Sequence, residues 1–174
     1  MRLHSRLFLI PILYLALTAQ GPTGDPLYGT WEGGFHVPPE TFTSLVQLPQ
    51  GVQLDLTTAV TQTFRADGTF DSKNDITLKV LQAGNDNTLR MRMTASGTWA
   101  LEGETITQTT QSQEIVPVGD MTEQYLQRAP GLMNMFRVPE GHASTYTLMS
   151  VDANSLNLYL DDLGADLLMT RSES

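Results

Sequence analysis

Histidine and cysteine, the side chains that most often bind transition metals or carry out catalysis, are scarce in this chain. It has 3 histidines and no cysteine, and only His36 and His142 lie beyond the first few residues. Each has a carboxylate nearby in sequence, Glu40 after His36 and Glu140 before His142. Two histidines and two carboxylates could hold a metal if their segments met, but neither spacing is that of a known ligand motif. We therefore expect two solvated loop histidines and no metal site.

Patterns for other catalytic chemistries are missing as well. The absence of cysteine excludes thiolate nucleophiles, thiolate metal ligands and disulfides. Gly-x-Ser-x-Gly, which presents the nucleophile of many hydrolases, does not occur. The acidic stretches "GNDN" and "LDDLGAD" lack the spacing of a calcium-binding EF-hand, and Asp and Asn are common in turns for conformational reasons. The sequence predicts a protein with no catalytic residue and no cofactor.

The first 24 residues have the layout of a secretory signal peptide. Arg2 and Arg6 precede an uncharged run from Leu7 to Ala19, and small and polar residues follow. This run is shorter than the ~20 apolar residues that span a bilayer. We expect residues 1–24 to be cleaved on export and residues 25–174 to form one periplasmic or secreted domain.

The charge of the chain limits its partners. Its formal net charge is −9, and two of its basic residues lie in the predicted signal peptide, so the mature protein is more acidic still. A surface this negative repels nucleic acid and anionic membranes. No other segment is apolar enough to cross a bilayer, so we expect a soluble protein with no stable membrane anchor and no nucleic-acid partner.

Alternation of apolar and polar residues predicts β-strands from Gln53 onward, because successive side chains of a strand point to opposite faces. Turn sequences separate the alternating stretches, the clearest being Asp67-Gly68 within "RADGTF". The stretch 97–101 counts as a strand separate from "TLRMRMT" at 88–94, and the Thr-rich stretch 104–115 is expected to project past the core or to run along an edge. About eight to nine short strands joined mainly by tight turns predict an all-β, antiparallel up-and-down barrel.

Two longer connections interrupt this pattern. In residues 117–142, Asp120 is followed three residues later by Glu123, which predicts one short helix ending near Arg128. Residues 36–52 form the other connection. Long connections without strands are uncommon unless they are functional.

The only two tryptophans of the chain occur in similar settings, "YGTWEGGF" at 28–35 and "SGTWALEG" at 96–103. Together with "FRADGTF", "GTWALEGETIT" and the final "LLMTR", they give residues 27–171 a strand order that resembles the lipocalin-like, or calycin, β-barrels. The resemblance is strongest to the small bacterial lipocalin-like domains of exported proteins. The Thr-Asp-Tyr of many lipocalins is absent, and the nearest text is "STYT" at 144–147.

The resemblance implies a particular structure for one end of the barrel. In that family a Gly-x-Trp of the first strand packs at the closed end, and an Arg of the last strand lies over the indole. Gly29, Trp31 and Arg171 match these positions, and a guanidinium over Trp gains ~0.5–2 kcal/mol. Trp99 would be a second core plug at the same base. The alternative is that Gly-Thr-Trp is a common start for a strand and that its recurrence is coincidence.

The interior of an eight-stranded barrel is either filled by its own side chains or holds one small ligand. The candidate inward-facing residues are Leu56, Val60, Phe64, Phe70, Ile76, Leu78, Leu89, Met91, Met93, Leu156 and Leu158. The candidate lid residues in the two long connections are Phe42, Leu45, Met133, Met135 and Phe136. The leading hypothesis is a non-enzymatic exported carrier of a small apolar molecule. The alternative is a solid barrel whose loops or acidic face contact a protein partner in the envelope or outside the cell.

Overall fold

The computed structural model describes residues 26–172 except 46–47, 49, 83, 85 and 130, and for residues 43–45 it describes the backbone alone. The predicted signal peptide, residues 1–24, lies outside the described residues.

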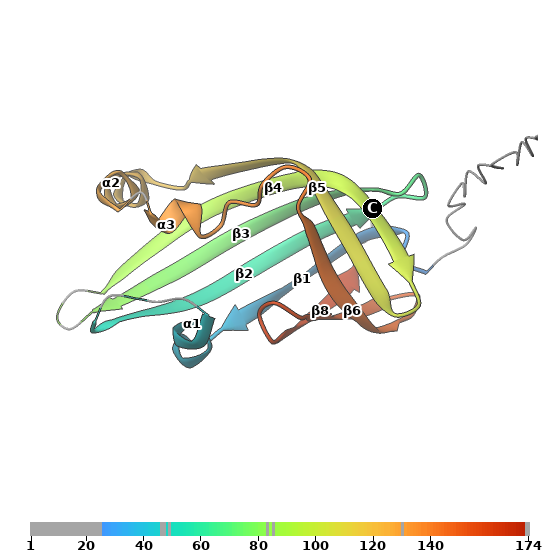
Figure 1. The fold of residues 1–174 in the computed structure, drawn as a ribbon, viewed down its shortest axis with the longest axis horizontal. Helices are drawn as coiled ribbons and strands as arrows, with labels where there is room; N and C mark the ends of the chain where they lie inside the picture. The colour runs from blue at the N-terminus through green and yellow to red at the C-terminus, as the bar shows by residue number, and fades with distance from the viewer. Residues whose placement is uncertain are drawn as a thin grey trace, which may run out of the picture.

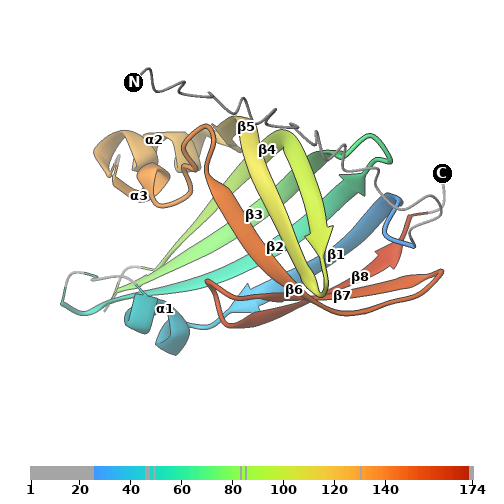
Figure 2. The same ribbon diagram turned by 45° about the vertical axis from the view of Figure 1, so that its right-hand side comes forward.

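Eight antiparallel strands pair in chain order to form one closed barrel (Figure 1). The strands are β1 (Gly29–Val37), β2 (Val52–Phe64), β3 (Thr69–Gln82), β4 (Asn87–Glu102), β5 (Thr105–Pro117), β6 (Ala143–Val151), β7 (Ser155–Leu160) and β8 (Ala165–Arg171). The barrel closes where β1 pairs with β8, from Trp31 opposite Arg171 to Gly34 opposite Leu168. Figure 2 labels β7 between β6 and β8. The predicted all-β, up-and-down architecture is confirmed.

Three short helices lie in the two long connections. The helix α1 (Pro39–Leu45) follows β1, and α2 (Asp120–Arg128) and α3 (Gly131–Asn134) follow β5. The predicted helix ending near Arg128 corresponds to α2, whereas α1 and α3 were not predicted. Figure 1 shows α1 on one side of the long strands β2 to β4 and α2 with α3 on the other. The connections therefore cover the same end of the barrel from two sides.

The eight strands agree with the predicted count of eight to nine, but the separate strand expected at 97–101 is the continuation of the stretch 88–94 within β4. Within β4 the pairing with β5 shifts register between Ser96 and Gly97, and Gln111 is the extra residue of this bulge. A Cβ atom at Gly97 would lie 2.0 Å from the carbonyl oxygen of Thr109. The glycine thus marks a close approach of two backbones in a bent strand.

The Thr-rich stretch lies in β5, and its two halves differ. Residues 105–109 pair with β4 and with β6, so they are internal to the sheet. Residues 112–117 pair with β4 alone. The expectation of an edge or a projecting strand therefore holds only for the second half, since β6 is too short to reach it.

Two apolar clusters fill the two ends of the barrel. The base cluster surrounds Trp31 and includes Leu27, Phe64, Phe70, Ile106 and Leu156. The helix-side cluster lies between β2, β3 and β4 and includes Phe42 of α1 and Leu126 of α2.

The helix α2 is also held to β4 by a hydrogen bond from the Arg90 backbone N–H to Thr122 Oγ1 at 3.1 Å. The space between the two clusters is where a site could form.

Candidate ligand-binding cavity

Trp31 and Arg171 close the base of the barrel. The Trp31 side chain is 0% exposed, and its Nε1 donates a hydrogen bond to the Leu27 carbonyl at 2.8 Å. The Arg171 guanidinium carbon lies 4.2 Å from the centroid of the Trp31 ring. Its N–H groups donate to the carbonyls of Pro26, Tyr28 and Ala153. These contacts tie the last strand to the segment before β1 and to the β6–β7 turn, around a fully buried indole.

Gly29 lies directly under the same guanidinium. Its φ of +130° is one that residues with a side chain rarely adopt, and a Cβ there would lie 2.3 Å from Arg171 Nη1. The backbone conformation therefore favours glycine at this position, and a residue with a side chain would also displace the guanidinium. The three residues that the family resemblance implied for the base, Gly29, Trp31 and Arg171, are thus in mutual contact through the arginine.

Trp99 lies at the same end but is not buried like Trp31. Its ring is partly exposed and meets Phe64 edge to face, with 5.1 Å between the ring centroids. Its indole N–H donates to the Arg65 carbonyl at 3.2 Å, and its backbone N–H donates to the Gly68 carbonyl at 2.8 Å. These bonds hold Trp99 beside the β2–β3 turn, so its ring packs on the rim of the base cluster. The expectation of a second core plug was therefore wrong.

A cavity in two adjoining parts lies between the base cluster and the helix-side cluster. The base-side part has a volume of about 380 Å³ and contacts Val60 and Leu158 of the base cluster. The helix-side part has a volume of about 510 Å³ and contacts Leu56 and Ile76 of the helix-side cluster. Phe35, Met93, Met135 and Leu163 are among the residues that line both parts. The barrel interior is therefore not solid.

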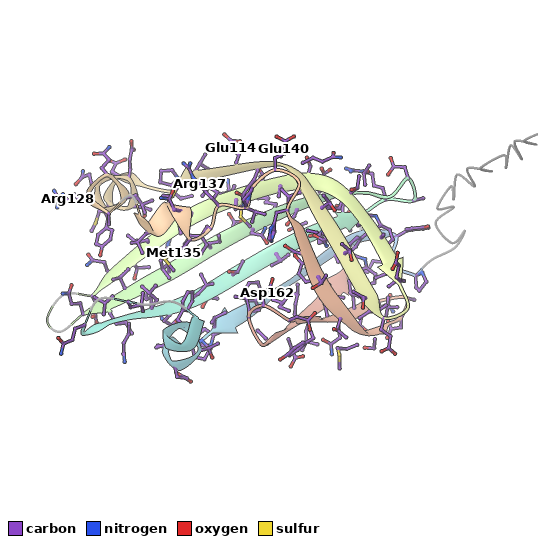
Figure 3. The ribbon with its side chains drawn as sticks, in the orientation of Figure 1. Glu114, Arg128, Met135, Arg137, Glu140 and Asp162 are labelled. Atoms are coloured by element: carbon purple, nitrogen blue, oxygen red, sulfur yellow. The ribbon has the colours of Figure 1, made fainter. Side chains whose placement is uncertain are left out.

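Both long connections contribute to the wall of this cavity. Phe42 of α1 and Phe136 line the helix-side part, and Met135 lines both parts. Met135, just after α3, and Asp162, in the β7–β8 turn, both line the two parts of the cavity and are labelled in Figure 3. Of the other predicted lid residues, Met133 packs against the helix-side cluster, and the side chain of Leu45 lies outside the described residues.

The segment that carries Met135 and Phe136 is fastened to the barrel by one side chain. Gln113 of β5 donates through Nε2 to the Phe136 carbonyl at 2.9 Å and accepts through Oε1 from the Val138 N–H at 2.9 Å. Val138 also lines both parts of the cavity. Gln113 thus acts as a clip that holds residues 136–138 over the barrel.

Only part of the predicted interior set lines the cavity. The residues that do are Leu56, Val60, Ile76, Met93 and Leu158. The others are buried within the two clusters: Phe64, Phe70 and Leu156 at the base, and Leu78, Leu89 and Met91 on the helix side. The period-two pattern separates inward from outward side chains but does not give their height along the barrel, so it cannot separate residues that fill the ends from residues that surround a space.

The sequence analysis missed the polar residues of the interior. Gln62, Asn74 and Gln108 are only 6%, 7% and 7% exposed, and all three line the base-side part. Asn74 Nδ2 donates to Ser72 Oγ at 2.9 Å, whereas Gln62 Nε2 has no hydrogen-bond partner among the described residues. The sequence did contain a signal for Gln62, because it lies two residues from both Val60 and Phe64 and therefore points to the same face of the strand. A polar residue at an inward position of a strand is the informative exception to the alternation.

The electrostatic character of the cavity comes from acidic and neutral groups. Asp161 and Asp162 line the base-side part, and no Lys or Arg does so in either part of the cavity as far as the described residues extend. Burial raises the pKa of the Tyr146 hydroxyl, a hydrogen bond with Ser144 lowers it, and the charge of Asp162 raises it again. Tyr146 therefore faces the cavity as a neutral hydroxyl at physiological pH.

The two histidines occupy different surroundings. His36 lies in β1 rather than in a loop, and its Nε2 is 3.2 Å from Asp55 Oδ1 of β2, so the expectation of a loop histidine was wrong there. The error arose because β1 extends to Val37. His142 lies just before β6 and lines the base-side part of the cavity. Within the described residues no three His, Cys, Asp or Glu side chains gather as metal ligands would.

Neither a protein-family model nor a curated protein matches this chain. Among solved structures it is similar to a lipocalin-like protein from Bacteroides uniformis, with 17% sequence identity over 84% of this chain and 99% of that chain and a TM-score of 0.39. The strand pairing of the chain itself defines the class: a closed, eight-stranded, antiparallel up-and-down barrel. Across the described residues, no helix combines the length and hydropathy needed to cross a bilayer.

Proposed function

We propose that this protein is a non-enzymatic, exported carrier that binds one small, mainly apolar molecule inside its barrel. The observation that supports this most directly is the cavity between the two clusters, walled by Phe35, Met93 and Leu163 and covered by residues of both long connections. Pockets for small molecules commonly have volumes of a few hundred Å³ and a mostly apolar wall with a few polar groups. The cavity fits this description.

The energy available to such a carrier is modest. Burying about 300 Å² of apolar ligand surface at ~25 cal/mol per Å² contributes roughly 7 kcal/mol. Loss of translational and rotational freedom costs at least about 4 kcal/mol of this. The remaining ~3 kcal/mol corresponds to a dissociation constant in the millimolar range. We therefore expect millimolar or weaker binding for a ligand held by burial of this area alone, and tighter binding only where polar groups of the wall are also used.

The alternative function, a solid barrel that acts as an interaction module, depends on a filled interior. It also depends on apolar residues of 117–142 being available to a partner. Leu126, Leu132, Met133 and Phe136 instead pack against the helix-side cluster, whereas Val118 and Met121 are exposed. The open interior and the packing of these four side chains favour the carrier.

A fluorescence titration with the exported protein tests the proposal. N-phenyl-1-naphthylamine is a neutral apolar dye whose emission rises when it leaves water, and we expect one saturable site. Met93→Trp places a larger side chain where the two parts of the cavity meet, so dye affinity should fall at least about tenfold. Thr94→Trp adds the same side chain at the next, exposed position of β4 and should bind like the wild type.

Thermal unfolding of both variants shows whether they fold. If Met93→Trp does not fold, Met135→Trp on the covering segment replaces it. Absence of saturable dye binding by the wild type, or equal binding by a folded cavity variant, contradicts the proposal.

Export is tested separately. Expression of the full chain and of a chain without residues 2–24, followed by cell fractionation and intact mass measurement, should give a processed protein outside the cytoplasm only in the first case. Native mass spectrometry of the processed protein from its own host should reveal a co-purifying small molecule. Cytoplasmic retention of an unprocessed full chain contradicts the proposed export.

A further inference from the structure

Gln62 is a buried amide with an unused donor that lines the cavity. It is 6% exposed, it lies on the inner face of β2, and its Nε2 has no partner among the described residues. A buried polar group left without a hydrogen bond costs roughly 1–3 kcal/mol, which is why nearly all such groups in folded proteins are paired. A group that enters the base-side part of the cavity and hydrogen bonds to Gln62 would remove this cost.

Gln62 does not stand alone. Asn74 of β3 and Gln108 of β5 are also buried and line the same part of the cavity. We call these three residues the amide belt. Amide side chains both donate and accept hydrogen bonds, so the belt suits a polar group of either kind. Above it, the helix-side part offers an apolar wall that includes Phe42, Leu56 and Ile76.

The charges around the cavity are unfavourable for an anion. Asp161 and Asp162 are the carboxylates of the base-side part and His142 is its histidine, and no Lys or Arg lines either part among the described residues. Arg137 is next to Val138 in sequence, but it lines a different hollow together with Glu114 and Glu140. Figure 3 labels these three side chains. A carboxylate brought to the amide belt would be buried without a counter-charge, which is costly.

We propose that the ligand of this cavity is a neutral amphipathic molecule, with an apolar chain or ring in the helix-side part and an uncharged hydrogen-bonding head group, such as a hydroxyl or an amide, at the amide belt. This inference rests on the proposed carrier function and specifies the chemical class of its ligand. It excludes the alkyl carboxylates, which share the apolar body but carry an anionic head.

Displacement of bound N-phenyl-1-naphthylamine tests this by comparing 1-decanol, decanamide and decanoate, which have the same chain length. At neutral pH we expect decanol and decanamide to displace the dye at concentrations at least about tenfold lower than decanoate. Decanol is also the more apolar molecule, so the decisive comparison is between the wild type and a variant without the Gln62 amide.

Gln62→Leu removes the amide and keeps an apolar side chain of similar size. Relative to decanoate, decanol and decanamide should bind this variant about tenfold more weakly than they bind the wild type, with each affinity calculated from the dye affinity measured on the same protein. Gln53→Leu makes the same change on the exposed face of β2 and should leave every affinity unchanged. Asn74→Leu repeats the test within the amide belt if Gln62→Leu does not fold.

The possible results separate the two proposals. Failure of the dye itself to bind the wild type contradicts both of them. If the dye binds but decanoate displaces it as well as decanamide does, this inference is overturned and the carrier function stands. The same holds if a folded Gln62→Leu variant keeps the head-group preference of the wild type.

Discussion

Arg171 and Trp31 are paired residues of neighbouring strands, and the guanidinium of one lies 4.2 Å from the ring centroid of the other. They belong to the last and first strands, so their contact lies at the seam that closes the barrel. β1 and β8 would be the edge strands of an open sheet, and their pairing leaves neither edge free to pair with another chain. The stability of the seam should therefore depend strongly on the arginine.

Replacing Arg171 tests this dependence. Arg171→Met removes the cation–π contact and leaves the carbonyls of Pro26, Tyr28 and Ala153 without their donors. We expect the free energy of unfolding to fall by roughly 2–4 kcal/mol, measured by chemical denaturation. Arg171→Lys keeps the charge but lacks the planar group with its fixed donors, so it should recover only part of the loss. Equal stability of the wild type and Arg171→Met would show that the seam does not need this contact.

Gly97 should be intolerant of any side chain. A Cβ there would lie 2.0 Å from the Thr109 carbonyl oxygen and 3.0 Å from the Phe70 ring, so β4 and β5 would have to separate at their bulge. We expect Gly97→Ala to lower the free energy of unfolding by roughly 1–3 kcal/mol. Gly131→Ala is the control, because a Cβ at that position meets nothing within 4 Å. Similar melting temperatures for the two variants would contradict the prediction.

Loss of the Gln113 clip should loosen the segment over the cavity. Gln113→Ala removes both hydrogen bonds to residues 136–138. We expect faster hydrogen exchange at the Val138 amide and faster release of bound dye in stopped-flow measurements. Gln111→Ala changes the same residue type at a nearby exposed position of β5 and should leave both rates unchanged. Unaltered exchange in Gln113→Ala would mean that packing alone holds the segment.

Tyr146 should make the protein sensitive to alkaline pH. Burial is the main cause that raises the pKa of its hydroxyl above the ordinary value of 10.0, so the folded state keeps this proton to a higher pH than the unfolded state does. The associated stability is fully present below about pH 10 and is lost as the pH rises through the folded-state pKa. Tyr146→Phe should start somewhat less stable, because it lacks the hydrogen bond with Ser144, but should lose less stability between about pH 9 and pH 11. Urea denaturation at each pH measures the free energy of unfolding. Equal losses of this free energy by the wild type and Tyr146→Phe between about pH 9 and pH 11 would contradict the role given to Tyr146.

Much of the architecture could be predicted before any coordinates because alternation is a local property. Each strand of an antiparallel barrel has one face inward, so residues such as Leu54, Leu56 and Val60 recur at every second position. The helix α2 was also predictable, since its acidic first turn follows a Pro and Gly region at the end of β5. The errors came where a local pattern has two structural solutions. A glycine in a strand, as at Gly97, can mark a turn or a bulge, and Trp99 can enter a core or cover its rim.

The sequence by itself determined which side chains point inward and in what order the strands follow, because these depend on neighbours along the chain. It also supplied Gly29, Trp31 and Arg171 for the base. Only the tertiary structure decided the height of each inward residue along the barrel, and with it the division into two filled ends and a cavity between them. That height depends on strand register, on the bulge between β4 and β5 and on where the helices cover the barrel. Gln62, one inward glutamine among many strand residues, becomes a candidate ligand contact only because it lies level with that cavity.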